Sequence, residues 1–252
     1  MKIASWNVNS LKVRLEQVQS WLLESKVDVL CLQETKTEDV NFPLAELQQA
    51  GYQVVFSGQK TYNGVAIISK FALTDVQYGL PNFDDVQKRM IAATVDGVRV
   101  VCVYIPNGES VESDKYQYKL AWLAALQVWL KDELLRFPKL TILGDYNIAP
   151  EDRDVHDPVA WAGKVLCSEA ERAAFKGLQQ LGLRDAFRLF EQPEKSFSWW
   201  DYRMMGFRRN HGMRIDHILI SNAVDCSACS IDKAPRKLER PSDHTPVQAE
   251  IY

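Results

Sequence analysis

Residues 2–34, KIASWNVNSLKVRLEQVQSWLLESKVDVLCLQE, indicate the class of fold. The stretch begins with an apolar run of strand length, and residues 10–25 then place Leu11, Leu15, Val18 and Leu22 at the spacing of an amphipathic helix. A second apolar run, VDVLCLQ at 27–33, again has the length of a strand. Strand, helix and strand in succession predict an α/β fold.

The same alternation continues along the chain. A helical pattern covers 116–137, and Ser168 with Glu171 three positions later has the spacing of a capping box that starts another helix. Residues 151–167 have mixed charge and little periodicity, so we expect a long surface loop there. Further strands are expected at 52–57, 64–69, 89–95, 98–105, 140–145, 197–203, 213–221 and 247–252, which implies more than one sheet.

The composition is that of a globular protein. Of the 252 residues, 46% are apolar and 25% are charged, which suits one large domain or two closely packed halves. The amino terminus lacks a signal-peptide pattern and no apolar run could span a membrane, so we expect a cytoplasmic protein without a membrane partner. The five cysteines favour reduced thiols, and the C-x-x-C pair Cys226 and Cys229 lacks the further ligands of a zinc site.

The net charge of −3 is not that of a protein that coats nucleic acid by bulk electrostatics. A local basic run nevertheless spans residues 203–214, where Arg203, Arg208, Arg209 and Arg214 occur without an acidic residue. Such a run either contacts phosphates or forms a solvated face, and composition alone leaves both open.

Polar side chains recur where the predicted strands end, and such groups converge in open α/β sheets because ligands bind beyond the carboxyl ends of strands. Each residue alone has a simpler explanation as a strand terminator or turn former. Their recurrence indicates metal-assisted hydrolysis. Before the last strand, Asp243 and His244 pose the same choice, with a turn after Pro241 as the simpler alternative. The strand-end residues are Asn7, Glu34, Tyr104, Asn107, Asp145 and Asn147.

Eight segments occur in order from Ala4 to Val247: ASWNVNSLKVR, VLCLQETK, YNGVAIIS, VYIPNGES, LGDYNIAP, FSWWDYR, MRIDHILIS and RPSDHTPV. Together they resemble the exonuclease III family of apurinic/apyrimidinic (AP) endonucleases, within the endonuclease/exonuclease/phosphatase superfamily. The resemblance implies a four-layer α/β sandwich, with two packed mixed β-sheets flanked by helices, forming a single catalytic domain over 1–252. It also implies a Mg²⁺-dependent phosphodiesterase acting on DNA, with Mn²⁺ as a substitute ion.

Carried over by this resemblance, Glu34 is the principal metal carboxylate, and Asn7 and Asp243 complete or support its oxygen-rich shell. Magnesium prefers oxygen ligands and keeps several waters, so one or two carboxylates suffice. Asp145 matches the residue that orients and deprotonates the attacking water. Asn147, two positions later on the same side of an extended segment, is suited to bind that water or a phosphate oxygen.

The resemblance assigns Tyr104 to the scissile phosphate and pairs Asp216 with His244. Asp216 would then orient the imidazole and favour its charged form, and His244 would donate to a phosphate oxygen. His217 is a rival partner, but adjacent residues of a strand point to opposite faces, so we expect its ring to lie away from this site.

Trp199, Met213 and Ile215 match positions that line a pocket for a base-less deoxyribose, although ordinary core packing explains Ile215 equally well. Met213 stands where relatives carry Trp or Leu, and Asn107 stands where some carry Gln. The loop 151–167 also departs from the family pattern. These departures leave open the balance between incision at AP sites and trimming of 3′ ends.

For the DNA backbone, the resemblance suggests Arg89 and Lys119, and the basic run adds Arg203, Arg208 and Arg209 beside Asp216. The leading hypothesis is therefore a monomeric DNA-repair nuclease that cleaves duplex DNA 5′ to AP sites and clears blocked 3′ ends. A second hypothesis is a 3′-exonuclease or 3′-phosphatase with little AP incision. A third, from another class, is a catalytically silent DNA-binding relative.

Overall fold

The computed structural model describes residues 1–252 and contains two six-stranded sheets. The first sheet has the order β13-β14-β1-β2-β4-β3, in which only β1 and β2 pair in parallel. All of its strands except β13 fit the predicted runs. Their bounds are β1 Lys2–Asn7, β2 Val29–Gln33, β3 Gln53–Ser57, β4 Val65–Ser69, β13 Cys226–Ile231 and β14 Val247–Ile251.

The second sheet has the order β5-β6-β7-β8-β12-β9. Here β7 and β8 form the parallel pair, and the other neighbours are antiparallel, so both sheets are mixed. A short hairpin of β10 Trp199–Trp200 and β11 Gly212–Met213 stands apart from both sheets. The strands of the second sheet are β5 Thr74–Tyr78, β6 Met90–Val95, β7 Val98–Tyr104, β8 Leu140–Asp145, β9 Leu183–Asp185 and β12 Asp216–Ser221.

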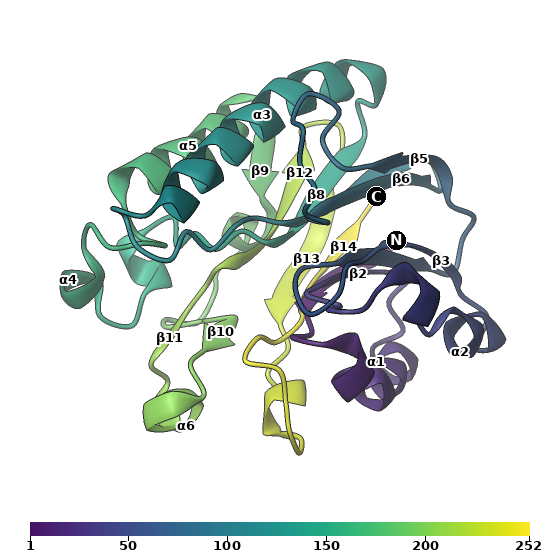
Figure 1. Ribbon diagram of the computed structural model, residues 1–252, viewed down its shortest axis with the longest axis horizontal. Helices are drawn as coiled ribbons and strands as arrows, with labels where there is room; N and C mark the ends of the chain where they lie inside the picture. The colour runs from purple at the N-terminus through teal and green to yellow at the C-terminus, as the bar shows by residue number, and fades with distance from the viewer.

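The helices form the two outer layers, as Figure 1 shows. Apolar side chains of α1 Leu11–Ser25 and α2 Leu44–Gln49 pack on the first sheet, and those of α3 Asp114–Arg136 and α5 Glu169–Gln180 pack on the second. The largest buried cluster, of 21 residues, lies between the sheets. Removal of this apolar surface from water holds the layers together and confirms the predicted four-layer α/β sandwich.

Several elements differ from the sequence-based expectation. The strands β5, β9 and β13 were not predicted, because β5 and β13 are polar edge strands and β9 has three residues. Within 151–167 the chain forms the turn of 3₁₀ helix η2 Asp152–Asp154 and the short α4 Pro158–Trp161 rather than an uninterrupted loop. The predicted strand 197–203 is reduced to β10, because Arg203–Met205 form the 3₁₀ turn η4, followed by α6 Gly206–Arg209.

The predicted capping box at the start of α5 is present. The Ser168 side chain accepts a hydrogen bond from the Glu171 amide, and the Glu171 carboxylate accepts one from the Ser168 amide. These contacts satisfy amides that the first helical turn leaves free. None of the helices combines the length and apolar character needed to cross a membrane.

Candidate active site

Strand register places three predicted residues side by side. Tyr104 at the end of β7 is opposite Asp145 at the end of the parallel β8, and Asp216 at the start of the antiparallel β12 is opposite the same Asp145. Asp145 and Asp216 are buried, and Tyr104 is half-buried. One edge of the second sheet therefore carries all three side chains.

The first sheet contributes Asn7 and Glu34 to the same place. Asn7 ends β1 and pairs with Gln33 at the end of β2, so Glu34 follows directly beside it. The Asn7 Nδ2 atom donates to Glu34 Oε1 and to Asp145 Oδ2, both at 2.9 Å. The Asn7 amide nitrogen therefore bridges the two sheets, while its Oδ1 accepts a hydrogen bond from the Asn9 amide.

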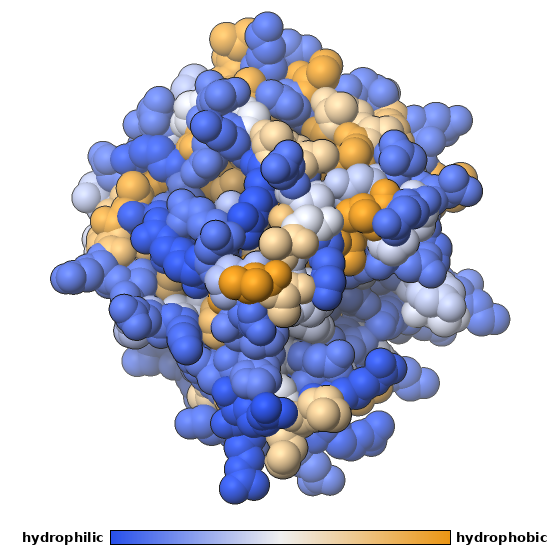
Figure 2. Space-filling view, turned by 90° about the vertical axis from the view of Figure 1, so that its left-hand side faces the viewer, coloured by the Kyte–Doolittle hydropathy of each residue, from blue (hydrophilic) through white to orange (hydrophobic).

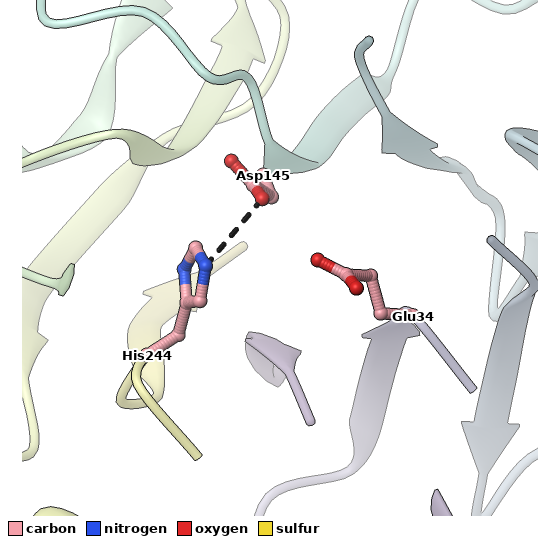
Figure 3. Close-up of side chains that lie close together, drawn as sticks. All are labelled: Glu34, Asp145 and His244. Atoms are coloured by element: carbon pink, nitrogen blue, oxygen red, sulfur yellow. Dashed lines mark ion pairs between the residues drawn. The ribbon is translucent and has the colours of Figure 1, made fainter. Parts of the chain in front are cut away.

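His244 brings the C-terminal segment into this cluster, and Figure 3 shows its ring beside Asp145 with the Glu34 carboxylate directed toward the same space. Its Nδ1 lies 2.9 Å from Asp216 Oδ2, and its Nε2 lies 3.6 Å from Asp145 Oδ2. One polar atom each from Glu34, Asp145 and His244 lie within 4.8 Å of one another. Residues distant in sequence thus form one polar centre.

The surroundings raise the pKa values of two groups in this centre, His244 and Asp145. Burial would lower the pKa of His244, but the carboxylates of Asp216 and Asp145 raise it to about 10. Burial raises the pKa of Asp145 to about 7 against the opposing charge of His244, and Asp216 adds to the rise. A charged imidazole thus stands next to a carboxyl group that exchanges protons near neutral pH, an arrangement suited to general acid–base chemistry.

Glu34 and Asp145 are the residues best suited to hold a metal ion. Although burial acts to raise the pKa of Glu34, the Lys36 ammonium, 2.8 Å from its Oε2, and the Asn7 amide bring the pKa below its ordinary value. Glu34 is therefore ionised and offers the oxygen ligands that hard cations prefer. His244 is the poorer ligand, because its Nδ1 donates to Asp216 and a protonated ring has no free lone pair.

Asp243 lines the same cavity, and both of its oxygens accept hydrogen bonds, as both oxygens of Glu34 do. Its Oδ1 accepts a hydrogen bond from Asn9 Nδ2 at 2.9 Å, and its Oδ2 accepts one from Trp199 Nε1 at 3.0 Å. Burial opposes a low pKa for Asp243, yet the neighbouring His244 charge and these donors lower it. In this arrangement Asp243 orients Trp199 and holds Asn9 near Glu34.

Asn147 reaches the centre through an unusual backbone conformation. It has a φ of 50°, so the chain after Asp145 turns into the left-handed region instead of continuing in the extended form expected from the sequence. The Asn147 amide donates to Asp145 Oδ1 at 2.9 Å, and its side-chain Oδ1 accepts from Asn107 Nδ2 at 3.0 Å. Asn147 therefore lies beside Asp145, and Asn107 lies beside Asn147.

These groups line a cavity of about 290 Å³. Trp199 and Ile215 form part of its wall, whereas Met213 is fully buried behind them and does not line it. The wall also contains three apolar residues that were not predicted individually from the sequence, although all three fall in the divergent loop 151–167. They are Trp161, Val165 and Leu166.

Two cations are buried: Lys119, which was expected to contact DNA, and Arg214 of the basic run. Lys119 has no exposed surface and pairs with Glu171, so its expected phosphate contact is wrong. Arg214, at the end of the basic run, is 1% exposed and pairs with Asp154 and Asp185. The residues next to a lysine or arginine in the sequence do not show whether the fold will bury it. Its carboxylate partner, such as Glu171 for Lys119 or Asp185 for Arg214, lies far along the chain.

Arg89 takes a supporting position. Its guanidinium lies 4.8 Å from the centre of the Tyr104 ring, and its Nη1 donates to the Tyr104 carbonyl at 3.2 Å. Burial together with Glu34 and Asp145 raises the Tyr104 pKa well above its ordinary value, so the phenol stays protonated. Arg89 thus holds the backbone and ring of a phenol that faces the cavity.

Arg203, Arg208 and Arg209 are exposed on the β10–β11 hairpin that projects from the sheets. The hairpin also exposes Met204 and Met205, both with a φ of 54°. Figure 2 shows a largely hydrophilic face with small, separate apolar spots on this side of the molecule.

His217 lies away from the site, as expected, with Nε2 2.9 Å from the Ile148 carbonyl.

The chain belongs to the endonuclease/exonuclease/phosphatase family, whose model matches residues 4–244. The agreement with curated relatives spans the whole chain: exodeoxyribonuclease III from Haemophilus influenzae is 37% identical, with 100% of each chain covered. The protein is therefore an exonuclease III-type nuclease.

Solved structures agree with this assignment. The 3′ phosphatase NExo from Neisseria, bound to a product DNA hairpin, is 50% identical with a TM-score of 0.98 over 100% of this chain and 99% of that one. An AP endonuclease from Archaeoglobus fulgidus is 41% identical with a TM-score of 0.95 over 99% and 98% of the two chains. The relatives thus include a protein named as a 3′ phosphatase and one named as an AP endonuclease.

Proposed function

We propose that this protein is a Mg²⁺-dependent DNA-repair phosphodiesterase that acts as a monomer in the cytoplasm. It hydrolyses duplex DNA 5′ to AP sites and removes nucleotides or blocking groups from 3′ ends. The observation that carries the proposal is the convergence at one cavity of Glu34, Asp145 and His244, whose ring is bonded to the buried Asp216. The named activities of the relatives, exonuclease, 3′ phosphatase and AP endonuclease, support it.

Each protein group has a role that follows from its surroundings. Asp145, with a pKa of about 7, accepts a proton from the attacking water. His244, kept charged by Asp216, donates to a phosphate oxygen as negative charge accumulates there. Asn147 and Tyr104 place their polar atoms next to these groups and bind the phosphate or the water.

Glu34 would hold Mg²⁺, with Asp145 the nearest further carboxylate and Asn7 orienting both. The donor set fits a hard cation, because carboxylate oxygens dominate it and the ring of His244 is engaged with Asp216. When bound, the ion would neutralise charge on the phosphate. Asp243, whose oxygens accept from Asn9 and Trp199, would complete or support this shell.

The test uses two labelled duplexes, one with an internal AP-site analogue and one with a recessed 3′-phosphate. We expect cleavage of both with Mg²⁺, none with chelator, and a loss of about a hundredfold or more in Asp145→Asn, because the proton acceptor is gone. The exposed Asp157→Asn provides a matched control with unchanged activity. Chelator-resistant cleavage, or full activity of Asp145→Asn, would contradict the proposal.

A second candidate is a specialist for 3′ ends, and the cavity wall favours it. Trp161, Val165 and Leu166 share the cavity with the catalytic groups, and Leu166 is held there with a φ of 74°. A base-less sugar within a continuous strand needs this space, whereas a terminal phosphate needs less of it. If the protein is such a specialist, we expect rapid hydrolysis of the 3′-phosphate and slow incision at the AP-site analogue.

Leu166→Gly tests the second candidate directly, since glycine suits the positive φ and removes the side chain. If the wall sets the preference, this variant gains AP incision relative to 3′-phosphate hydrolysis. Leu189→Gly, at an exposed leucine outside the cavity, controls for loss of stability. Equal ratios in parent and Leu166→Gly would remove this candidate.

A further inference from the structure

A buried ion pair lies directly beneath the cavity. Lys119 of α3 and Glu171 of α5 are both fully buried and bonded to each other. The Lys119 ammonium also donates to the backbone carbonyls of Asn107 at 3.0 Å and Asn147 at 2.6 Å. All three N–H groups of the ammonium therefore have acceptors, two of which belong to loops at the site.

Glu171 extends this network to the third loop. Its Oε1 accepts a hydrogen bond from the Leu166 amide at 3.0 Å, and its Oε2 accepts from the Ser168 amide at 3.1 Å and from the Ser168 hydroxyl. The ion pair thus connects the loop after β7, the loop after β8 and the segment before α5. Each loop supplies a residue to the cavity wall, namely Asn107, Asn147 and Leu166.

The backbone at these positions needs such support. Leu166 has a φ of 74°, in a region that a leucine occupies only when the surrounding structure holds it there. Asn147 has a φ of 50°, which asparagine adopts more readily than other side chains do. Lys119 bonds the carbonyl of Asn147, and Glu171 bonds the amide of Leu166. Apolar side chains of similar volume often replace a buried ion pair without loss of stability, but they cannot bond these backbone groups.

We propose that Lys119 and Glu171 are positioning residues that set the geometry of Asn107, Asn147 and Leu166, and with it the preference for an internal AP site or a 3′ end. The inference rests on the proposed function, because it concerns the substrates of the same cavity. It replaces the expected contact of Lys119 with DNA, since a fully enclosed ammonium does not reach a phosphate.

The main test is the double variant Lys119→Met/Glu171→Leu, assayed on the AP-analogue and 3′-phosphate duplexes. We expect a folded protein whose kcat falls by about tenfold to a hundredfold, because small displacements of reacting groups are costly. The ratio of kcat/KM for the two substrates should also change. If the role were purely structural, the variant would only have a smaller folded fraction. The rates on both substrates would then fall equally, and the ratio of their kcat/KM values would not change.

The matched control is Arg99→Met/Glu133→Leu, which removes another buried ion pair, with exposed fractions of 3% and 2%. Glu133 lies on the same helix α3 as Lys119, but neither Arg99 nor Glu133 lines the cavity. Its substrate ratio should equal that of the parent. Glu171→Gln keeps an acceptor for the Leu166 amide and should remain nearer the parent ratio than the double variant.

Hydrogen exchange supplies a readout independent of catalysis. Amides in 105–109, 145–149 and 164–168 should exchange faster in the double variant than in the parent, while those of β1 and β2 stay protected. If the parent cleaves neither duplex, the proposed function fails, and exchange still decides the positioning role. Unchanged exchange in these segments, or an unchanged substrate ratio in an active double variant, overturns the inference. If the double variant does not fold, Lys119→Met, which removes the bonds to the Asn107 and Asn147 carbonyls and leaves those of Glu171, is judged by the same two measurements on 105–109 and 145–149.

Discussion

The imidazole of His244 lies 2.9 Å from the Asp216 carboxylate, although the two residues are 28 positions apart in the chain. Asp216 begins β12 and His244 precedes β14, so the pair links the second sheet to the segment that enters the first. The contact sets the ring orientation and its charge, because Asp216 is the largest influence that raises the His244 pKa against burial.

Replacing Asp216 with Asn should lower the pKa of His244, since the charge that stabilises the imidazolium is removed. We expect kcat to fall about a hundredfold, the scale for losing a donor to a developing oxyanion, and the alkaline limb of the rate profile to move to lower pH. Steady-state rates across pH measure both effects. If the alkaline limb does not move in a variant of normal thermal stability, Asp216 does not control the pKa of His244.

The parent enzyme should show a bell-shaped pH dependence. Asp145 must be ionised, so activity is present above its pKa of about 7 and is lost as pH falls through it. His244 must be charged, so activity is present below its pKa of about 10 and is lost as pH rises through it. The dependence of kcat on pH, at saturating Mg²⁺ and DNA, checks this. A rate that stays constant as the pH falls below the pKa of Asp145 and rises above the pKa of His244 would count against both roles.

Replacing Glu34 with Gln should weaken metal binding. We expect the Mg²⁺ concentration for half-maximal activity to rise about tenfold or more, because the variant lacks an ionised carboxylate. Titration with Mn²⁺, followed by electron paramagnetic resonance, measures binding without catalysis. Glu38→Gln, an exposed position four residues further on, should match the parent. Equal Mn²⁺ affinity in Glu34→Gln and the parent would move the metal site elsewhere.

The exposed arginines of the hairpin should contribute to DNA binding. In Arg208→Ser/Arg209→Ser, the slope of log affinity against log salt should become shallower by about 0.9 for each phosphate that the variant no longer neutralises. Equilibrium binding to uncleaved duplex in chelator, at several salt concentrations, gives the slope. Lys131→Ser removes an exposed cation from α3 and should leave the slope unchanged. An unchanged slope in the hairpin variant would identify the run as a solvated face.

Arg214 should matter for folding rather than for phosphate binding. Arg214→Met leaves Asp154 and Asp185 without their buried partner, so we expect a loss of about 3–5 kcal/mol in the free energy of unfolding. Urea denaturation measures this loss. Arg208→Met, at an exposed position of the same run, should change the free energy of unfolding little. Similar losses in both variants would contradict the burial difference.

Local sequence determined much of the architecture and the set of chemical groups. Apolar runs of strand length and helical spacing predicted the central strands, α1 and α3, because burial on a sheet requires those periodicities. Polar residues at strand ends predicted a site at the sheet edge, where β7 and β8 do place Tyr104 and Asp145. Polar edge strands such as β5 carry no such signal and were missed.

Beyond the Asp216–His244 pairing that the family resemblance predicted, tertiary structure decided how these groups meet and which charges face water. Lys119 and Arg214 look like surface cations in the sequence, yet both are enclosed because carboxylates from remote segments accompany them. The bridge from Asn7 to Asp145 and the contact of His244 with Asp216 depend on how two sheets pack and register. Those relationships arise from long-range packing of the whole chain, which no local pattern encodes.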